Sequence, residues 1–502
     1  MARTAIIVFH GIGQHQEFDT LEGVAAALLK REGGDGAVTV KLVETGERPV
    51  AAATVQLGGE PVDLYEAYWS PWTKGKAGLL TIFWFLLLAG ARGLSTILFR
   101  GARFQRFLFG RAEEFQISLM TGFVLAFVMA FVVAIFATSG ALMWVAIGYG
   151  TAVMGLPIFD QCLLRDLRTW LYVLLLIGGG WLAIFGVTAA VSRGKLPMVL
   201  NVVLGGYMVS TVAGLVPLVM CVRRHWVGHE SRPWPRSCGS ESLDPWLDWV
   251  APANSLLRPY ADDATLGWLV LTLIALVVGL GYFFLIRERF TAYLGDVVAY
   301  LGAYRINEYY EVREQIRRRC LALARVVMDR RDESGKPFYS DVVVAGHSLG
   351  TVIGYDTMNA LLRDSPETAG RISAFLTLGS PLDKAAFLFR TDQGTGLSVR
   401  TRLLGAFQPM VSDQALRERV PWVNFYSGLD PISGSIEYYD PASKGTAWEG
   451  RVVNVVDRRS SIPVEAHTRY WEHAEVGEVL WMMAQPGKFS AAEIRERAGA
   501  MK

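Results

Sequence analysis

The sequence places a serine between two glycines at the end of an apolar run. Residues 346–350 read Gly-His-Ser-Leu-Gly, one residue after the β-branched run 342–344 and before a helical stretch that begins at Thr351. A strand, a tight turn with serine at its apex and a helix form the arrangement in which a serine hydroxyl is exposed as a nucleophile. Glycines two positions before and after Ser348 leave room for the strained backbone of such a turn. Ser348 is therefore the candidate nucleophile.

A serine hydroxyl is a weak nucleophile until a base takes its proton and a carboxylate orients that base. Of the seven histidines, only His467 and His473 follow Ser348, where the chain order of serine, acid and histidine places a base. His467 lies in a predicted loop, whereas His473 falls inside a helix predicted to begin near Tyr470. A loop at the edge of a sheet reaches a serine more readily than a side chain held within a helix, so His467 is favoured.

Two aspartates could orient the histidine. Asp430 lies in a turn after the predicted strand 423–426, and Asp383 follows the predicted strand 372–378. Both positions keep the chain order of serine, acid and histidine. Asp430 is the leading candidate because it lies at the tip of its turn, and Asp383 stays open as the alternative.

The first strand of the chain runs into a loop with two glycines. Residues 5–9 are apolar, and His10-Gly11-Ile12-Gly13 follows. In hydrolases with a nucleophile elbow, such a loop supplies one backbone N–H for the negatively charged oxygen of the reaction intermediate, and the residue after the nucleophile supplies the other. The sequence therefore predicts Ile12 and Leu349 as the oxyanion-hole residues.

Together these segments resemble an α/β-hydrolase of the lipase and esterase kind, over roughly residues 1–70 and 290–485, with the elbow as the only fairly specific motif. The resemblance implies an α/β fold with a mostly parallel sheet flanked by helices. It also implies roles for five residues: Ser348 as nucleophile, His467 as general base and then acid, Asp430 as its orienter, and Ile12 and Leu349 as oxyanion donors. The chain departs from the family because it begins at the strand that carries the oxyanion loop and because a long insert precedes the elbow.

That insert is apolar. The chain is 52% hydrophobic and 19% charged with a mean hydropathy of +0.28, which is typical of a membrane protein. The apolar excess lies between about residues 77 and 286. We therefore predict an N-terminal part of the hydrolase domain at 1–76, a transmembrane helical insert at 77–286, and a C-terminal part of the hydrolase domain at 287–502.

About six membrane spans fit the insert. Because Ile12 precedes the insert and Ser348 follows it, and both must reach one reaction intermediate, the number of spans must be even. Four spans remain an alternative if residues 77–111 lie in the membrane interface and residues 115–159 contribute one span and a re-entrant piece. Three arginines interleaved with phenylalanines in the first of these ranges suit an amphipathic surface segment. The six predicted spans are 77–98, two within 115–159, 169–192, 196–222 and 265–286.

The first residues lead directly into a strand, so the sequence predicts no export signal and a cytoplasmic catalytic domain on an inner or plasma membrane. With six spans, the loops on the hydrolase side carry fewer lysines and arginines than the opposite loops, which favours the reverse orientation. The four-span alternative moves the basic residues 100–111 to the inner side and removes much of this conflict.

No metal or cofactor is expected. The four cysteines are widely separated, and Cys221, His225, His229 and Cys238 lack the spacing of a standard metal site. A net charge of +2 argues against a nucleic-acid partner. The predicted partners are the lipid bilayer and a hydrophobic acyl substrate.

These observations predict a membrane-anchored serine hydrolase that cleaves an ester of a lipid or another hydrophobic acyl compound through an acyl-enzyme intermediate. Two alternatives remain open. A thioesterase or amidase would use the same residues, and a non-enzymatic membrane scaffold could keep a hydrolase-like domain for binding.

Overall fold

In a computed structural model of the protein, the chain divides into two compact units, residues 1–124 with 290–502, and residues 125–289. The described residues are 3–13, 16–33, 38–43, 50–78, 103–108, 111–116, 295–302, 308–386, 408–428, 430, 432–439, 451–459 and 463–501, with scattered positions between 81 and 91 and residues 130, 140 and 210. Almost all belong to the first unit. The predicted membrane insert therefore lies mostly outside the described residues. Within the described residues, no helix is long and apolar enough to cross a membrane, and the span counts stay predictions.

An eight-stranded sheet forms the centre of the first unit, in the order β10-β9-β8-β7-β1-β4-β3-β2. The strands from β10 to β4 run parallel, and β3 and β2 are antiparallel at one edge. The predicted α/β fold with a mostly parallel sheet is confirmed at this level. The bounds are β1 (Thr4–Phe9), β2 (Thr39–Val43), β3 (Val50–Leu57), β4 (Glu60–Ala67), β7 (Asp341–His347), β8 (Ile372–Leu378), β9 (Trp422–Ser427) and β10 (Val453–Asp457).

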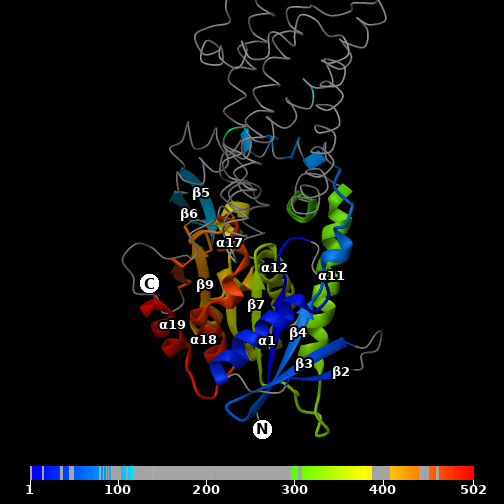
Figure 1. Cartoon of the computed structure of the whole chain (residues 1–502), viewed down its shortest axis with the longest axis vertical. Coiled ribbons are helices and arrows are strands. Elements are labelled where there is room, and N and C mark those ends of the chain that lie inside the picture. The colour runs from blue at the N-terminus through cyan, green and yellow to red at the C-terminus, as the bar shows by residue number, and fades with distance from the viewer. Residues whose placement is uncertain are drawn as a thin grey trace, which may run out of the picture. The chain divides into compact units, whose positions relative to one another are not determined.

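Side chains that alternate along the strands build two apolar layers, one on each face of the sheet. Along β1, Ile7 and Phe9 face one layer and Ile6 and Val8 face the other. Helices α11 (Glu308–Asp329) and α12 (Leu349–Asp364) cover the first face; α1 (Asp19–Glu32), α18 (Ala474–Met483) and α19 (Ala491–Ala500) cover the second (Figure 1). Because both faces are covered, the central strands are nearly continuous apolar runs, as is typical of parallel sheets.

Strand β1 lies between two strands that are far apart in the sequence, β4 and β7. Phe9 at its carboxyl end is in register with Ala67 of β4 and with Gly346 of β7. The carboxyl ends of parallel strands meet at one edge of a sheet, where ligands of α/β folds bind. The loop after β1 and the turn after β7 therefore meet at this edge.

Short elements complete the unit. The short helices are η1 (Ser70–Trp72), η4 (Pro366–Arg371), α13 (Leu382–Ala385), α15 (Pro409–Ser412), α16 (Gln414–Arg419), α17 (Pro463–Thr468) and η6 (Tyr470–Glu472). Strands β5 (Arg103–Leu108) and β6 (Arg111–Gln116) form a separate antiparallel pair. The sequence predicted an amphipathic surface segment here and a membrane span from residue 115. The two phenylalanines of β5, Phe104 and Phe107, are three positions apart, so the sequence has no period of two that would predict a strand.

Candidate active site

Ser348 lies in a strained turn between β7 and α12. Its backbone has φ 53° and ψ −129°, a conformation that is costly for any residue with a side chain. Its N–H donates to the carbonyl oxygen of Leu378 on the neighbouring strand at 2.9 Å. A Cβ on Gly350 would lie 2.3 Å from the carbonyl oxygens of Phe9 and His10. Only glycine permits this approach of α12 to β1, which gives a physical reason for the second glycine of the motif.

The hydroxyl of Ser348 lies against a histidine. His467 Nε2 is 2.8 Å from Ser348 Oγ, and both residues are buried. The sequence predicted His467 in a loop, but it lies near the end of the short helix α17. Pro463 begins this helix, since proline is tolerated in the first helical turn. The helix is too short to show a helical period in the sequence.

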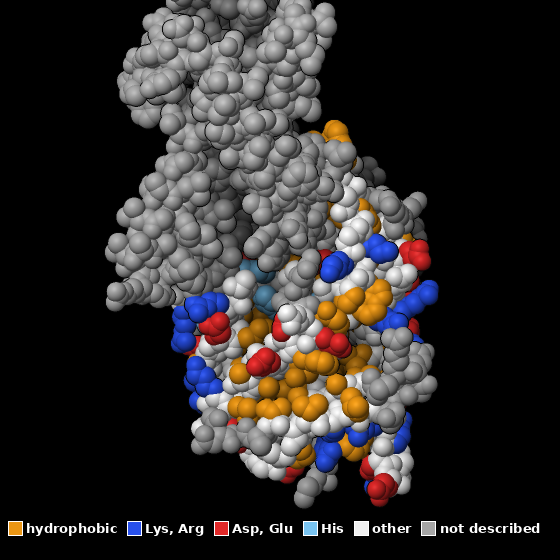
Figure 2. Space-filling view, turned by 45° about the vertical axis from the view of Figure 1, so that its right-hand side comes forward, with side chains coloured by type: hydrophobic (Ala, Val, Ile, Leu, Met, Phe, Trp, Pro, Cys, Tyr) orange, Lys and Arg blue, Asp and Glu red, His pale blue; other side chains and the backbone are white. Residues whose placement is uncertain are grey.

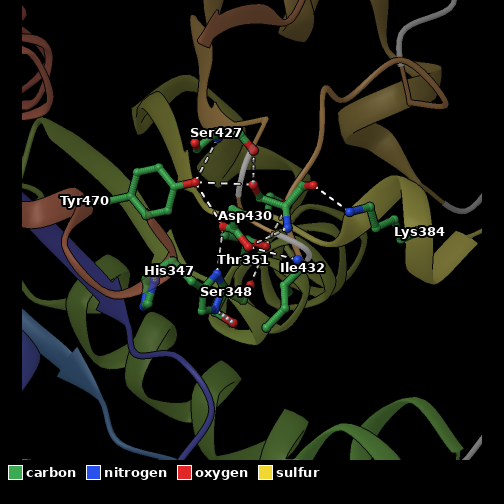
Figure 3. A network of polar contacts seen from close by, with 11 residues as sticks. His347, Ser348, Thr351, Lys384, Ser427, Asp430, Ile432 and Tyr470 are labelled. Carbon is green, nitrogen blue, oxygen red and sulfur yellow. Dashed lines mark hydrogen bonds and ion pairs between the residues drawn. The ribbon is translucent and has the colours of Figure 1, made fainter. Parts of the chain in front are cut away.

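Asp430 completes a line of three side chains with Ser348 and His467. Figure 3 labels Ser348, Asp430 and the groups bonded to Asp430, among them Ile432 and Tyr470. Its Oδ2 is 2.8 Å from His467 Nδ1. Its Oδ1 accepts hydrogen bonds from the backbone N–H groups of Ile432 at 2.8 Å and Ser433 at 3.1 Å. Burial alone would raise the pKa of Asp430, but His467 and these two N–H groups outweigh burial and lower it to about 2. Asp430 is therefore ionised at neutral pH, and His467 presents N–H to it through Nδ1 and a lone pair to Ser348 through Nε2.

The alternative acid has a different environment. Asp383 Oδ2 accepts the backbone N–H groups of Glu437 at 2.8 Å and Tyr438 at 3.0 Å. These bonds hold the chain that leads away from Asp430. Of the two aspartates, the structure brings Asp430 to His467.

The alternative base also lies elsewhere. The sequence predicted His473 inside a helix from Tyr470, but the structure has the single turn η6 followed by α18, and His473 is the residue before α18. Its Nδ1 lies 3.2 Å from Asp457 Oδ2 at the end of β10.

The predicted oxyanion residues belong to the two segments that border Ser348. A Cβ on Gly11 would lie 3.1 Å from the Cβ of Ser348 and 2.7 Å from His347 Nδ1, so the loop 10–13 packs directly against the elbow. Leu349 is the first residue of α12, and the first N–H groups of a helix have no acceptor within the helix. Both segments can therefore present backbone N–H groups near the nucleophile.

His10 supports this loop and has a single tautomer. Its Nδ1 donates to the carbonyl oxygen of Gly11 at 2.9 Å, and its Nε2 accepts the backbone N–H groups of Trp69 at 3.0 Å and Ser70 at 3.3 Å. The ring is fully buried and stacks on Trp69 with centroids 4.5 Å apart. A histidine that accepts at Nε2 and donates at Nδ1 is neutral, so His10 orients the backbone.

Tyr470 contacts the site, although the sequence did not single it out for chemistry. Its hydroxyl donates to Asp430 Oδ2 at 3.0 Å and accepts the backbone N–H of Ser427 at 3.0 Å. The hydroxyl of Ser433 lies 3.2 Å away. Because a carboxylate only accepts, the single phenol proton goes to Asp430. Burial raises the pKa of Tyr470, so this donor stays protonated. A tyrosine three residues after a histidine has no recognisable pattern, and only the fold reveals this contact.

Two further side chains brace the same loops. His347 Nε2 donates to the carbonyl oxygen of His467 at 2.7 Å, which connects the elbow to the base. Lys384 Nζ donates to the carbonyl oxygen of Ser433 at 2.7 Å. Burial lowers the pKa of Lys384 to about 8, against the opposing effect of the Asp430 charge.

The described residues contain no group of three histidine, cysteine, aspartate or glutamate side chains that could hold a metal ion. The cysteines and histidines weighed as metal ligands from the sequence lie outside these residues. On the face drawn in Figure 2, basic and acidic side chains are interspersed around hydrophobic ones. Searches against models of protein families, curated proteins and solved structures found no significant match.

Proposed function

We propose that the protein is a membrane-anchored serine hydrolase of the α/β-hydrolase kind. The observation that carries this proposal is the line from Ser348 Oγ to His467 Nε2 at 2.8 Å and from His467 Nδ1 to Asp430 Oδ2 at 2.8 Å. A strained serine at a strand-to-helix turn, a histidine 2.8 Å from its hydroxyl and a buried carboxylate are the parts that nucleophilic catalysis by serine requires.

The geometry supports a two-step reaction. Ser348 Oγ attacks the carbonyl carbon of the substrate while its proton moves to His467 Nε2, and Asp430 stabilises the resulting imidazolium. The backbone N–H groups of Ile12 and Leu349 stabilise the negatively charged oxygen. The intermediate collapses when His467 returns the proton to the leaving group, which leaves an acyl group on Ser348. A water that gives its proton to His467 then attacks this acyl group, and Ser348 is released.

An ester of a lipid or another hydrophobic acyl compound is the proposed substrate. The apolar composition and the long uncharged segments between residues 77 and 286 support a bilayer location, where such esters are concentrated. A thioester or amide would use the same three side chains, so the choice of leaving group is decided by assay.

Covalent labelling with a fluorophosphonate probe tests the reaction class. We expect the wild-type chain in detergent to be labelled, and Ser348→Ala and His467→Ala not to be. Ser340→Ala is the matched control, since Ser340 lies just before β7, at the end opposite Ser348, and its hydroxyl donates to Asp341 Oδ2 at 2.7 Å. Labelling that persists in Ser348→Ala would show another nucleophile. A folded wild-type chain that is never labelled would favour a scaffold.

Lipid extracts of cells that overproduce the wild type or Ser348→Ala test the substrate class. A lipid ester that falls only with the wild type supports the proposal. A change confined to water-soluble esters would contradict it.

A further inference from the structure

A buried carboxylate from a distant part of the sequence holds the predicted oxyanion loop. The backbone N–H of Gly13 donates to Asp296 Oδ2 at 2.9 Å, although the two residues are 283 positions apart. Asp296 is 5% exposed and belongs to the helical segment 295–301, which begins where the described chain resumes after the predicted insert.

The loop around Ile12 is fixed on both sides. The ring of His10 bonds to the carbonyl oxygen of Gly11 at 2.9 Å, and this carbonyl shares a planar trans peptide group with the N–H of Ile12, so fixing one directs the other. Asp296 fixes the next peptide group through the N–H of Gly13. The hydroxyl of Ser70 holds the carbonyl oxygen of Gly13 at 3.2 Å. Gly13 has φ 111°, a conformation that suits glycine.

The segment that carries Asp296 is itself anchored to the first unit. A Cβ on Gly295 would lie 3.8 Å from the Cβ of Ala77 and 3.9 Å from the side chain of Ile82, both at the start of the predicted insert. The hydroxyl of Tyr300 donates to Asp356 Oδ2 on α12 at 2.9 Å, and Arg313 pairs with the same oxygen at 2.7 Å. The segment therefore bonds to the oxyanion loop at one point and to the helix of the nucleophile at another.

The ionised side chain of Asp296 lowers the stability of the folded protein. Burial raises its pKa to about 6, and its contacts with Thr73 and Gly13 lower it only in part. Because the folded state favours the neutral acid, the ionised carboxylate destabilises the folded protein above that pH, relative to a neutral side chain of the same shape. If position 296 served only to support the fold, a neutral side chain there would make the folded protein more stable.

We propose that Asp296 is a positioning residue that holds the loop 10–13 in the conformation that stabilises the reaction intermediate, and that the segment after the predicted insert thereby sets the activity of the site. The inference rests on the proposed serine hydrolase function. Asp296 acts through the backbone of Gly13 and has no contact with the reacting atoms in this account.

The test compares three variants of the full chain in detergent on a soluble p-nitrophenyl ester. Asp296→Ala and Asp296→Leu remove the acceptor, and we expect kcat to fall about 100-fold with KM within about twofold, the loss seen when one oxyanion donor is removed. Asp296→Asn keeps an acceptor oxygen and should retain kcat within about fivefold. Asp383→Asn is the matched control, since Asp383 also accepts two backbone N–H groups, from a different loop, and should leave kcat within about twofold.

Thermal unfolding at pH 8 separates positioning from support of the fold. The midpoint of Asp296→Leu should equal or exceed that of the wild type. A kcat of Asp296→Leu within threefold of the wild type would overturn the proposal, and so would a Leu variant that fails to fold. If the wild type itself neither hydrolyses esters nor reacts with a fluorophosphonate, the proposed function is wrong. That outcome is distinct from an active wild type whose Asp296 variants lose kcat.

Discussion

The structure contains two histidine–aspartate pairs at one edge of the sheet, and they differ in what surrounds them. His467 lies 2.8 Å from Asp430, which follows β9, and His473 lies 3.2 Å from Asp457, which ends the neighbouring strand β10. Both aspartates are buried. Only His467 also contacts a serine, through its second ring nitrogen. The same two residue types thus form a candidate site in one place and a contact before a helix in the other.

The two carboxylates also differ in how many groups hold them. Asp430 accepts backbone N–H groups on Oδ1, and the imidazole of His467 and the phenol of Tyr470 lie on Oδ2. Asp457 accepts the backbone N–H of Arg459 at 3.0 Å on the oxygen that does not face its histidine. The four groups on Asp430 keep the imidazole of His467 in one orientation, which catalysis requires and a helix contact does not.

The largest expected difference in kcat is between the alanine variants of the two histidines. His467→Ala should lower kcat roughly 10⁶-fold, since loss of the base disables a serine nucleophile. His473→Ala should leave kcat within about threefold and lower only the midpoint of thermal unfolding. Steady-state hydrolysis of a soluble ester measures both. Equal losses of kcat in the two variants would remove the distinction between the pairs.

The asparagine variants of the aspartates should differ in kcat by less than the histidine variants do. Asp430→Asn should lower kcat about 10⁴-fold because the amide favours the wrong tautomer of His467. Asp457→Asn and Asp383→Asn should stay within about threefold of the wild type. A 10⁴-fold loss in Asp383→Asn, with Asp430→Asn active, would reverse the assignment of the acid.

Tyr470→Phe should have a smaller effect, about tenfold on kcat with KM unchanged. The variant removes one donor from Asp430, so the carboxylate attracts protons more strongly, and the acid limb of the pH profile of kcat/KM should move to higher pH. Tyr426→Phe is the control, since Tyr426 lies on the same strand as Ser427 and outside this network. A loss of kcat without a displaced acid limb would show that the hydroxyl supports only the fold.

The smallest expected effect concerns stability at acid pH. The pKa of Asp430 is about 2 in the folded protein and near 3.8 when unfolded, so its interactions contribute on the order of 2 kcal/mol above pH 4, and this contribution disappears as the pH falls through about 2. Urea unfolding of the wild type and Asp430→Asn at pH 7 and at pH 2.5 measures it. The difference in free energy of unfolding between the wild type and Asp430→Asn should be smaller at pH 2.5 than at pH 7. At pH 7, the difference between the wild type and Asp457→Asn should be smaller than that for Asp430→Asn.

Sequence reasoning worked best where local patterns are strong. Strand β8 has the predicted bounds 372–378, and the elbow strand and the first strand were placed within a few residues, because continuous apolar runs are typical of buried parallel strands. The loop predicted around His467 and the helix predicted to contain His473 were both wrong. Helices of one or two turns, such as α17 and η6, are too short to show a helical period in the sequence. The strand pair β5 and β6 was not predicted, because its polar and aromatic residues show no period of two.

Contacts between distant residues were beyond the sequence. The bond from Tyr470 to Asp430 spans 40 positions, and the bond from Gly13 to Asp296 spans 283. Neither leaves a local pattern, because each depends on which loops the sheet brings together. The residues that do the proposed chemistry were therefore found by type and order, whereas those that hold them were found only by geometry.

The central place of β1 has a consequence for synthesis of the chain. β4 is made soon after β1, but the other neighbour of β1, β7, begins only at Asp341. At usual rates of translation, the ribosome needs roughly tens of seconds to reach that strand. During this interval the nascent N-terminal region keeps one long apolar strand edge unpaired, which is a surface that holds chaperones or attracts other chains. The incomplete sheet must be kept from pairing with other chains until β7 has been made.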